Sequence, residues 1–174
     1  MNQVNWDQLA TLYRLKHFSS RLKESPRGYQ NDHLEIPIFP QDLRLRTYQH
    51  QAVANWLENK GRGTLKMATG SGKTIIALAI ATELYQQIGL QVLLIVCPSR
   101  HLVSQWSREC RKFNLKPIIA MTRVNNWQGE LSNQLYNLSG NSQFLTIITT
   151  NSTLISRGFQ SQVKYFPAKT LIVG

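Results

Sequence analysis

The sequence is poor in cysteine, in acidic residues and in long apolar runs. Its two cysteines, Cys97 and Cys110, are too few for a disulfide framework, and neither belongs to a cluster that would indicate a metal site. No segment reaches the roughly 20 apolar residues that a membrane helix needs. Residues 1–13 lack the basic flank and apolar stretch of a secretory signal. We therefore expect a cytoplasmic protein without a membrane partner, with reduced and partly buried thiols.

The shortage of acidic residues leaves a strong positive charge. Nine aspartates and glutamates stand against 20 lysines and arginines, for a formal net charge of +11. This excess favours a polyanionic partner such as nucleic acid, although a balance without functional meaning is the alternative. The basic residues gather near the start of the chain and around one predicted helix: Arg14, Lys16, Arg21, Lys23 and Arg27, then Arg100, Arg108, Arg111, Lys112 and Lys116.

The length and the apolar content indicate one domain with a core. The chain has 174 residues, of which 42% are hydrophobic, and a second full domain is not expected. Residues 1–40 carry the apolar spacing of one short helix, followed by a polar stretch with several prolines. We interpret residues 1–40 as an N-terminal extension and linker, and residues 41–174 as the main domain.

From residue 41 onward, segments with helical periodicity alternate with short apolar runs. Helices are predicted over 46–59, 73–87, 99–113, 127–137 and 152–159, and strands over 64–68, 91–97, 117–121, 144–149 and 170–173. Every predicted strand except the first is nearly all apolar, as expected for strands that are covered on both faces. The pattern predicts an α/β fold in which helices cover both faces of a parallel sheet.

A glycine-rich segment follows the first predicted strand and opens a helix. It reads Met67-Ala68-Thr69-Gly70-Ser71-Gly72-Lys73-Thr74. Gly70 and Gly72 allow the backbone to turn its N–H groups toward phosphate oxygens, and the helix adds its positive N-terminal end. In such a loop Lys73 reaches the β and γ phosphates and the Thr74 hydroxyl holds Mg²⁺. The alternative is a glycine turn that precedes a helix by chance.

This loop resembles motif I of the superfamily 2 helicases, because Met67 stands where small kinases and GTPases usually keep a glycine. Upstream, Leu45-Arg46-Thr47-Tyr48-Gln49 resembles the adenine-recognising Q motif of the same family. Gln49 lies 24 positions before Lys73 (73 minus 49), a spacing that the family also has. The resemblance implies that Gln49 binds adenine, that Arg46 lies beside it, and that residues Ala68 to Thr74 bind ATP.

Two downstream segments resemble DNA-contacting motifs of the family. The first is an apolar run that ends in Pro98-Ser99-Arg100, where Pro98 breaks the strand and Ser99 could cap the next helix. The free N–H groups of that helix and Arg100 would then face a DNA phosphate. The second runs from Thr149 to Leu154, and it assigns DNA contact to Thr150. A plain helix cap is the alternative role of this hydroxyl-rich stretch.

The resemblance implies a RecA-like domain that uses ATP and Mg²⁺. The Leu-Arg-Thr-Tyr-Gln form favours DNA as its substrate, and RNA is the alternative, because contacts to backbone phosphates alone do not distinguish the two. The relatives are helicase-type subunits of restriction systems and DNA-repair translocases of the DEAD/DEAH-box group, so partner subunits of such systems are expected. In the family, a strand like Leu171-Ile172-Val173 leads into an Asp-Glu pair, but here Gly174 follows. The one carboxylate side chain after Glu109 is Glu130.

We therefore expect the front part of the first motor domain, which by itself binds ATP and nucleic acid with little or no hydrolysis. The last predicted strand should leave an unpaired sheet edge. Two other functions stay open. The chain could be a non-catalytic DNA-binding module, or another P-loop enzyme such as a nucleoside kinase.

Overall fold

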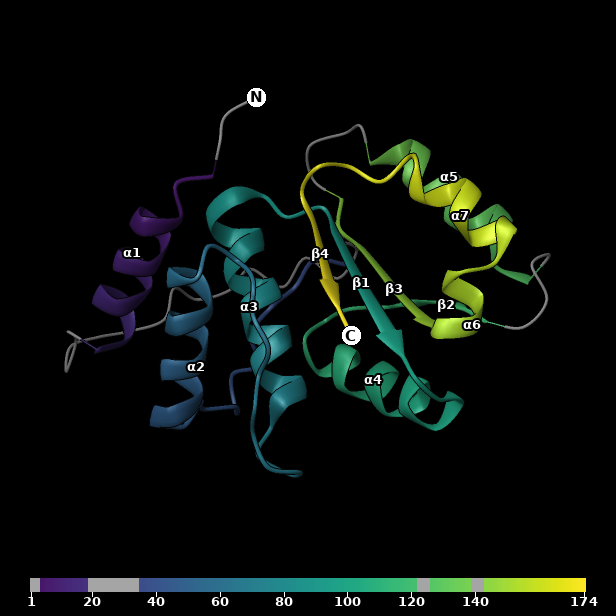
Figure 1. Ribbon diagram of the computed structural model, residues 1–174. Helices are drawn as coiled ribbons and strands as arrows, with labels where there is room; N and C mark the ends of the chain where they lie inside the picture. The colour runs from purple at the N-terminus through teal and green to yellow at the C-terminus, as the bar shows by residue number, and fades with distance from the viewer. Residues whose placement is uncertain (1–3, 19–34, 122–125, 139–142) are drawn as a thin grey trace. The chain divides into compact units, whose positions relative to one another are not determined.

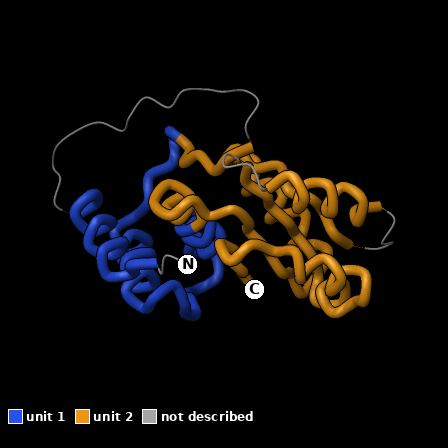
Figure 2. The backbone as a smooth tube through the Cα atoms, turned by 90° about the horizontal axis from the view of Figure 1, so that it is seen from above, with its two compact units in different colours: residues 1–33, 41–80 blue, residues 34–40, 81–174 orange. Residues whose placement is uncertain are grey.

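The structure is a computed structural model that describes residues 4–18, 35–121, 126–138 and 143–174. The chain divides into two compact units, coloured separately in Figure 2. Unit 1 comprises Met1–His33 and Gln41–Ile80, and unit 2 comprises Leu34–Pro40 and Ala81–Gly174. Three residues of the first basic group, Arg21, Lys23 and Arg27, lie outside the described residues. The proposed division at residue 40 stays a prediction.

Unit 1 consists of helices and connecting segments in its described residues. Helix α1 (Trp6–Phe18) packs along α2 (Thr47–Glu58), and the first half of α3 (Lys73–Ile88) completes the unit. The contact between α1 and α2 includes the edge-to-face rings of Trp6 and Trp56, 6.1 Å apart, and the ion pair of Arg14 with Glu58. The helix predicted near the N-terminus is present, and it is fixed by its neighbour rather than isolated.

The strand predicted over Thr64–Ala68 is wrong. This segment pairs with no strand among the described residues, and its polar members Thr64 and Lys66 are exposed. Only Leu65 and Met67 are partly buried, so the segment offers a weak apolar face. A strand needs a partner for its backbone N–H and C=O groups, and propensity alone does not supply one.

Unit 2 contains a four-stranded parallel sheet (Figure 1). Its strands lie in the order β2-β3-β1-β4: β1 (Val92–Cys97), β2 (Ile118–Ala120), β3 (Leu145–Thr150) and β4 (Thr170–Val173). These four predicted strands are confirmed to within one residue at each end. Cys97 lies opposite Thr150, and Ala120 opposite Thr149. The carboxyl ends of β1, β2 and β3 therefore meet at one edge of the sheet.

Helices cover both faces of this sheet, as the sequence predicts. On one face, Val92 and Leu94 form a core with Leu131 of α5 (Gln128–Asn137), with its N-cap residue Trp127, and with Phe159 of α7 (Arg157–Val163). Residues that alternate with these point to the opposite face. That face, which includes Cys97, is covered by α4 (Arg100–Lys112), which contacts β1 and β3.

The helix predicted over 152–159 is two short helices. Helix α6 (Asn151–Leu154) ends before Ile155, and α7 begins after Ser156. The Ser156 hydroxyl accepts a hydrogen bond from the backbone N–H of Phe159, which is a helix N-cap. The serine therefore starts a new helix where periodicity alone predicts a continuous one.

The two thiols are free and fully buried, more so than expected. Burial raises the pKa of Cys97 to about 11 and that of Cys110 to about 12. Neither is therefore a reactive thiolate near neutral pH.

At the end of the sheet, β4 pairs with β1 on one side, and the Ile172 side chain is 64% exposed. Among the described helices, none has the length and apolar content to cross a membrane.

Candidate nucleotide loop and nucleic-acid pocket

The glycine-rich loop of unit 1 has the backbone conformation that its sequence predicts. Gly70 has φ +81° and Gly72 has φ +86°, both in the left-handed region where residues with a Cβ are strained. At Gly72 a Cβ would also overlap the side-chain nitrogen of Gln49, whereas at Gly70 it would meet open space. Ala68 and Thr69 are exposed before the turn, and α3 begins at Lys73 with Thr74 half-buried.

The Lys73 side chain lies over its own loop. Its Nζ donates hydrogen bonds to the backbone oxygens of Met67 and Ala68, each at 3.0 Å. The ammonium thus stays exposed at the N-terminal end of α3, where a helix of 16 residues places its positive end. The Ser71 hydroxyl in the same loop is buried and has no hydrogen-bond partner among the described residues.

Gln49 connects the start of α2 to the loop. Its Oε1 accepts from the backbone N–H of Arg46 at 2.9 Å, and its Nε2 donates to the Ser71 backbone oxygen at 3.1 Å. The Tyr48 hydroxyl donates to the same oxygen at 2.9 Å. Gln49 is buried, while the side chain of Arg46 at the helix N-cap is exposed. An amide has two N–H donors and two acceptor lone pairs, so Gln49 keeps one of each for another partner.

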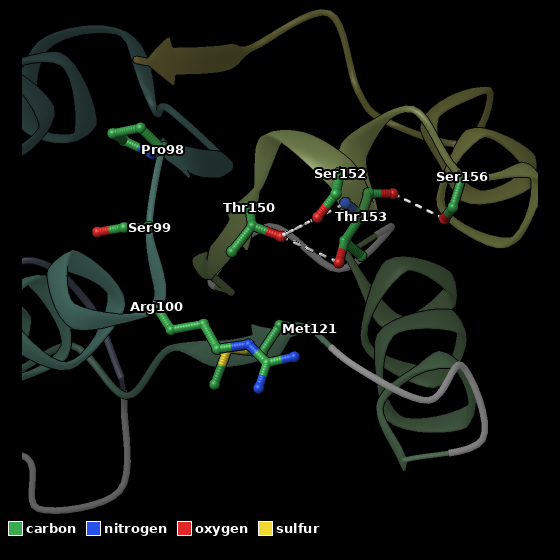
Figure 3. Close-up of a pocket in the computed structure, with 8 residues that line it drawn as sticks. All are labelled: Pro98, Ser99, Arg100, Met121, Thr150, Ser152, Thr153 and Ser156. Carbon is green, nitrogen blue, oxygen red and sulfur yellow. Dashed lines mark hydrogen bonds between the residues drawn. The ribbon is translucent and has the colours of Figure 1, made fainter.

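A second site lies in unit 2, at the carboxyl ends of the strands. A hollow of about 430 Å³ collects side chains that follow β1, β2 and β3 (Figure 3): Pro98, Ser99, Arg100, Met121, Thr150, Ser152, Thr153 and Ser156. Open parallel sheets usually bind ligands at this edge. All four residues that sequence reasoning assigned to nucleic acid thus line one pocket.

The first segment of the pocket differs in detail from the sequence prediction. Ser99 occupies the N-cap position of α4, but its side chain forms no capping hydrogen bond with any described group. In Figure 3 its hydroxyl points away from Thr150. The Ser99 backbone is extended (φ −143°), as at the N-caps of α6 and α7. The first N–H groups of α4 thus receive no hydrogen bond from the Ser99 side chain, and they lie beside the exposed Arg100, which extends toward Met121.

The hydroxyls of the third segment bond to one another. Thr150 Oγ1 accepts from the Thr153 backbone N–H at 3.4 Å and lies 3.1 Å from Ser152 Oγ. Thr150 is therefore a helix cap, the alternative that the sequence left open, and it is also buried. Ser152 is exposed and presents the accessible hydroxyl of this group.

The sequence did not assign four residues of the pocket to nucleic acid. Ser152 and Thr153 lie within the second motif without an assigned contact, whereas Met121 and Ser156 belong to no recognised motif. For Met121 there was a usable signal, because it directly follows a predicted strand and parallel strands end at a common edge. Ser156 had no such signal, since its place depends on the break between α6 and α7.

The fold and these two sites define a protein class. A parallel sheet with helices on both faces, a glycine-rich loop that opens a helix, and a strand-end pocket are the features of a RecA-like segment of a superfamily 2 helicase. More specifically, residues 42–172 match the family described as the type III restriction enzyme res subunit, and the chain belongs to that family. This membership places it outside the nucleoside kinases.

Individual relatives match shorter regions. The chain is 38% identical over 82 residues to the DNA 3'-5' translocase XPB2 of Sulfurisphaera tokodaii, which covers 47% of this chain and 17% of that protein. It is 40% identical over 65 residues to an uncharacterized protein of Mycobacterium leprae, covering 37% of this chain and 11% of the relative. A Mycobacterium tuberculosis protein is 41% identical over 64 residues, which cover 36% of this chain and 11% of that protein. The chain therefore matches a small part of each relative's length.

Proposed function

We propose that this chain is the ATP-binding segment of a DNA helicase or translocase that couples ATP hydrolysis to movement along DNA. The observation that carries the proposal is the glycine-rich loop. Gly70 and Gly72 take positive φ angles directly before α3, and Lys73 lies at the first position of that helix. The similarity to a relative named as a DNA 3'-5' translocase supports DNA as the substrate.

The residues of the loop fit ATP with Mg²⁺. At Gly72 the Gln49 side chain approaches so closely that no Cβ fits, and the buried Ser71 hydroxyl lacks a partner among the described residues. The backbone N–H groups of residues 70–74 would hold phosphate oxygens, Lys73 would neutralise the β and γ phosphates, and Thr74 would bind Mg²⁺. To do so, Lys73 must exchange its bonds with the Met67 and Ala68 oxygens for bonds to phosphate.

By itself the chain should hydrolyse ATP slowly or not at all. Phosphoryl transfer to water needs a positioned metal and an oriented nucleophile. In the part of the chain that the structure describes, no Asp or Glu residue directly follows any of the four strands. Glu130, the one carboxylate side chain after Glu109, lies in α5. A phosphate-release assay that found rapid, DNA-stimulated turnover, abolished by Lys73→Ala, would contradict this part of the proposal.

DNA would bind at the strand-end pocket. The first N–H groups of α4, the Arg100 guanidinium and the exposed Ser152 hydroxyl are all phosphate donors, and they converge on one hollow. Contacts to phosphate carry no base information, so binding there should not depend on sequence. Partner subunits of a restriction or repair system fit the family, and a cytoplasmic location fits such a role.

The test is a titration of a fluorescent ATP analogue with Mg²⁺ into wild type and Lys73→Ala. Hydrogen bonds to charged groups contribute about 1.5–3 kcal/mol, so the variant should bind about 10- to 150-fold more weakly. Lys66→Ala is the matched control, because Lys66 is also exposed and lies just before the loop. Equal affinities of wild type and Lys73→Ala would overturn the proposed nucleotide site.

A non-catalytic DNA-binding module is the second candidate. It is favoured by one observation, the pair of hydrogen bonds that already holds Lys73 against its own loop. In this case DNA binding would survive Lys73→Ala and would ignore added nucleotide. Fluorescence anisotropy of a labelled DNA strand, with and without ATP and Mg²⁺, separates the two candidates.

A further inference from the structure

A second groove in unit 2 has no role in the function proposed above. It measures about 440 Å³ and lies between α4 and β2, which is an edge strand of the sheet. Its apolar part comes from Val103, Ile119 and Met121. Its polar part is a stripe on α4, made by His101, Ser104, Arg108 and Arg111 at the spacing of one helix face.

The stripe carries positive charge that no ion pair with another described residue offsets. Arg108 and Arg111 are exposed, and neither forms an ion pair with a residue in the described ranges. Glu109, the acidic residue of the same helix, is bound instead by Lys112 at 2.8 Å. Arginines beside an apolar floor suit a ligand with regularly spaced anions and apolar parts between them.

This groove continues the strand-end pocket. Met121 lines both hollows, and the neighbouring residues Arg100 and His101 line one each. From His101 to Arg111 the helix rises about 15 Å, which is enough for several nucleotides of a strand. The groove therefore extends away from the pocket along α4; this helix is labelled in Figure 1.

We propose that a single DNA strand held at the strand-end pocket passes over Met121 into this groove, where Arg108 and Arg111 bind its phosphates. The hydroxyls of Ser104 and Ser107 lie along the same path, and the apolar floor contacts sugars and bases. The inference rests on the proposed DNA binding at the pocket. It adds a second phosphate-binding segment that the helicase motifs of this sequence do not include.

An acidic peptide is the other polyanion that such a groove could bind, by adding a strand to β2. Its backbone would have little to pair with, because β2 has only three residues, Ile118–Ala120. A peptide paired with β2 would also make no use of the strand-end pocket, although the two hollows share Met121. The geometry therefore favours the nucleic-acid strand.

The experiment measures the binding of fluorescein-labelled oligothymidylates to the full chain by anisotropy, over a range of salt concentrations. Two lengths are used, about 5 and about 16 nucleotides, near the ends of the range that single-strand sites occupy. The variants are Arg108→Gln with Arg111→Gln, and separately Arg100→Gln. Lys112→Gln is the control for charge on the same helix, since Lys112 does not line the groove.

We expect the double variant to bind the long strand about tenfold more weakly at low salt and the short strand normally. Each phosphate contact contributes about 0.7 to the slope of log K against log salt for a single strand, so the slope should fall by about 1.4. Arg100→Gln should weaken both lengths, and Lys112→Gln neither.

Other outcomes overturn the inference at identifiable points. If Arg100→Gln weakens both lengths but the double variant changes neither, the pocket is supported and the groove is not part of the path. If Lys112→Gln lost as much DNA affinity as the double variant, the effect would come from net charge and not from the groove. If no oligonucleotide binds wild type, the proposed function fails together with the inference. If a glutamate-rich peptide needs the two arginines while the DNA does not, the groove is a protein-binding surface.

Discussion

The glycine-rich loop of unit 1 and the strand-end pocket of unit 2 both gather groups that suit phosphate, but they are assembled differently. The loop is one continuous segment of eight residues, 67–74, joined by Gln49. The pocket takes its residues from the ends of three strands, β1, β2 and β3. The first site is thus determined mainly by local backbone conformation, and the second by the register of a sheet.

The two sites should therefore respond differently to single substitutions. In the loop, a single added methyl group at a glycine changes the backbone on which every proposed phosphate contact depends. In the pocket, the backbone is held by β pairing and by the buried bond from the Thr149 hydroxyl to the Ala120 oxygen at 2.8 Å. A single side-chain change there should remove one contact and leave the rest in place.

The largest effect is expected at Gly72. Gly72→Ala adds strain at φ +86° and an overlap with the Gln49 amide, whereas Gly70→Ala adds strain at φ +81° alone. Left-handed strain costs about 1–2 kcal/mol, so Gly70→Ala should weaken binding of an ATP analogue about tenfold and Gly72→Ala at least about 100-fold. DNA binding should be normal in both. Equal losses in the two variants would show that the Gln49 contact is unimportant.

A smaller effect is expected at Gln49, and it separates two roles. Gln49→Ala removes the bonds to the Arg46 N–H and the Ser71 oxygen, which should weaken ATP-analogue binding about tenfold. If Gln49 binds adenine, ATP affinity falls and GTP affinity does not. If it only positions the loop, both fall equally. Competition titrations with ATP and GTP on wild type and Gln49→Ala decide between them.

Much of this protein could be predicted from its sequence. The helices α2 to α5 follow from helical periodicity, and the four strands of the sheet follow from short, nearly continuous apolar runs, which in β1 and β3 become buried on both faces. The segment at Thr64–Ala68 failed, since a strand depends on a partner that local sequence does not specify. At the sites, the glycine-rich loop could be predicted from one continuous segment of sequence. The positions of Ser99, Met121 and Ser156 in the pocket could not, because they depend on where separate segments meet in the fold.

At the pocket, Thr150 tests whether its hydroxyl is only a helix cap. Thr150→Ala should lower the free energy of unfolding by about 1 kcal/mol, because the Thr153 N–H loses its acceptor, while Thr150→Ser should keep it. Urea unfolding measures this difference. Ser152→Ala is the comparison for DNA affinity, since Ser152 is exposed. If Thr150→Ala weakens DNA binding more than Ser152→Ala does, the buried hydroxyl contacts the DNA after all.

The smallest effect concerns pH, and it should act on unit 1. His17 of α1 and His50 of α2 lie with ring centroids 4.7 Å apart, and the Tyr13 hydroxyl is bonded to His50 Nδ1 at 2.9 Å. Partial burial, followed by the charges of His50 and Lys16, lowers the pKa of His17 to about 4. Burial also lowers the pKa of His50.

Because both pKa values are lowered on folding, the unfolded chain binds protons more readily than the folded one. The stability of the contact between α1 and α2 is therefore fully present above the ordinary histidine pKa of about 6.5 and is lost as the pH falls toward about 4. His17 lies at the surface, so solvent screening should keep the loss below about 1 kcal/mol. Urea midpoints at about pH 7.5 and pH 5, for wild type and His17→Gln, measure it. If His17→Gln keeps the pH dependence of wild type, other groups cause the effect. If the DNA affinity of wild type falls over the same pH range as its stability, unit 1 and the strand-end pocket are coupled and do not respond separately.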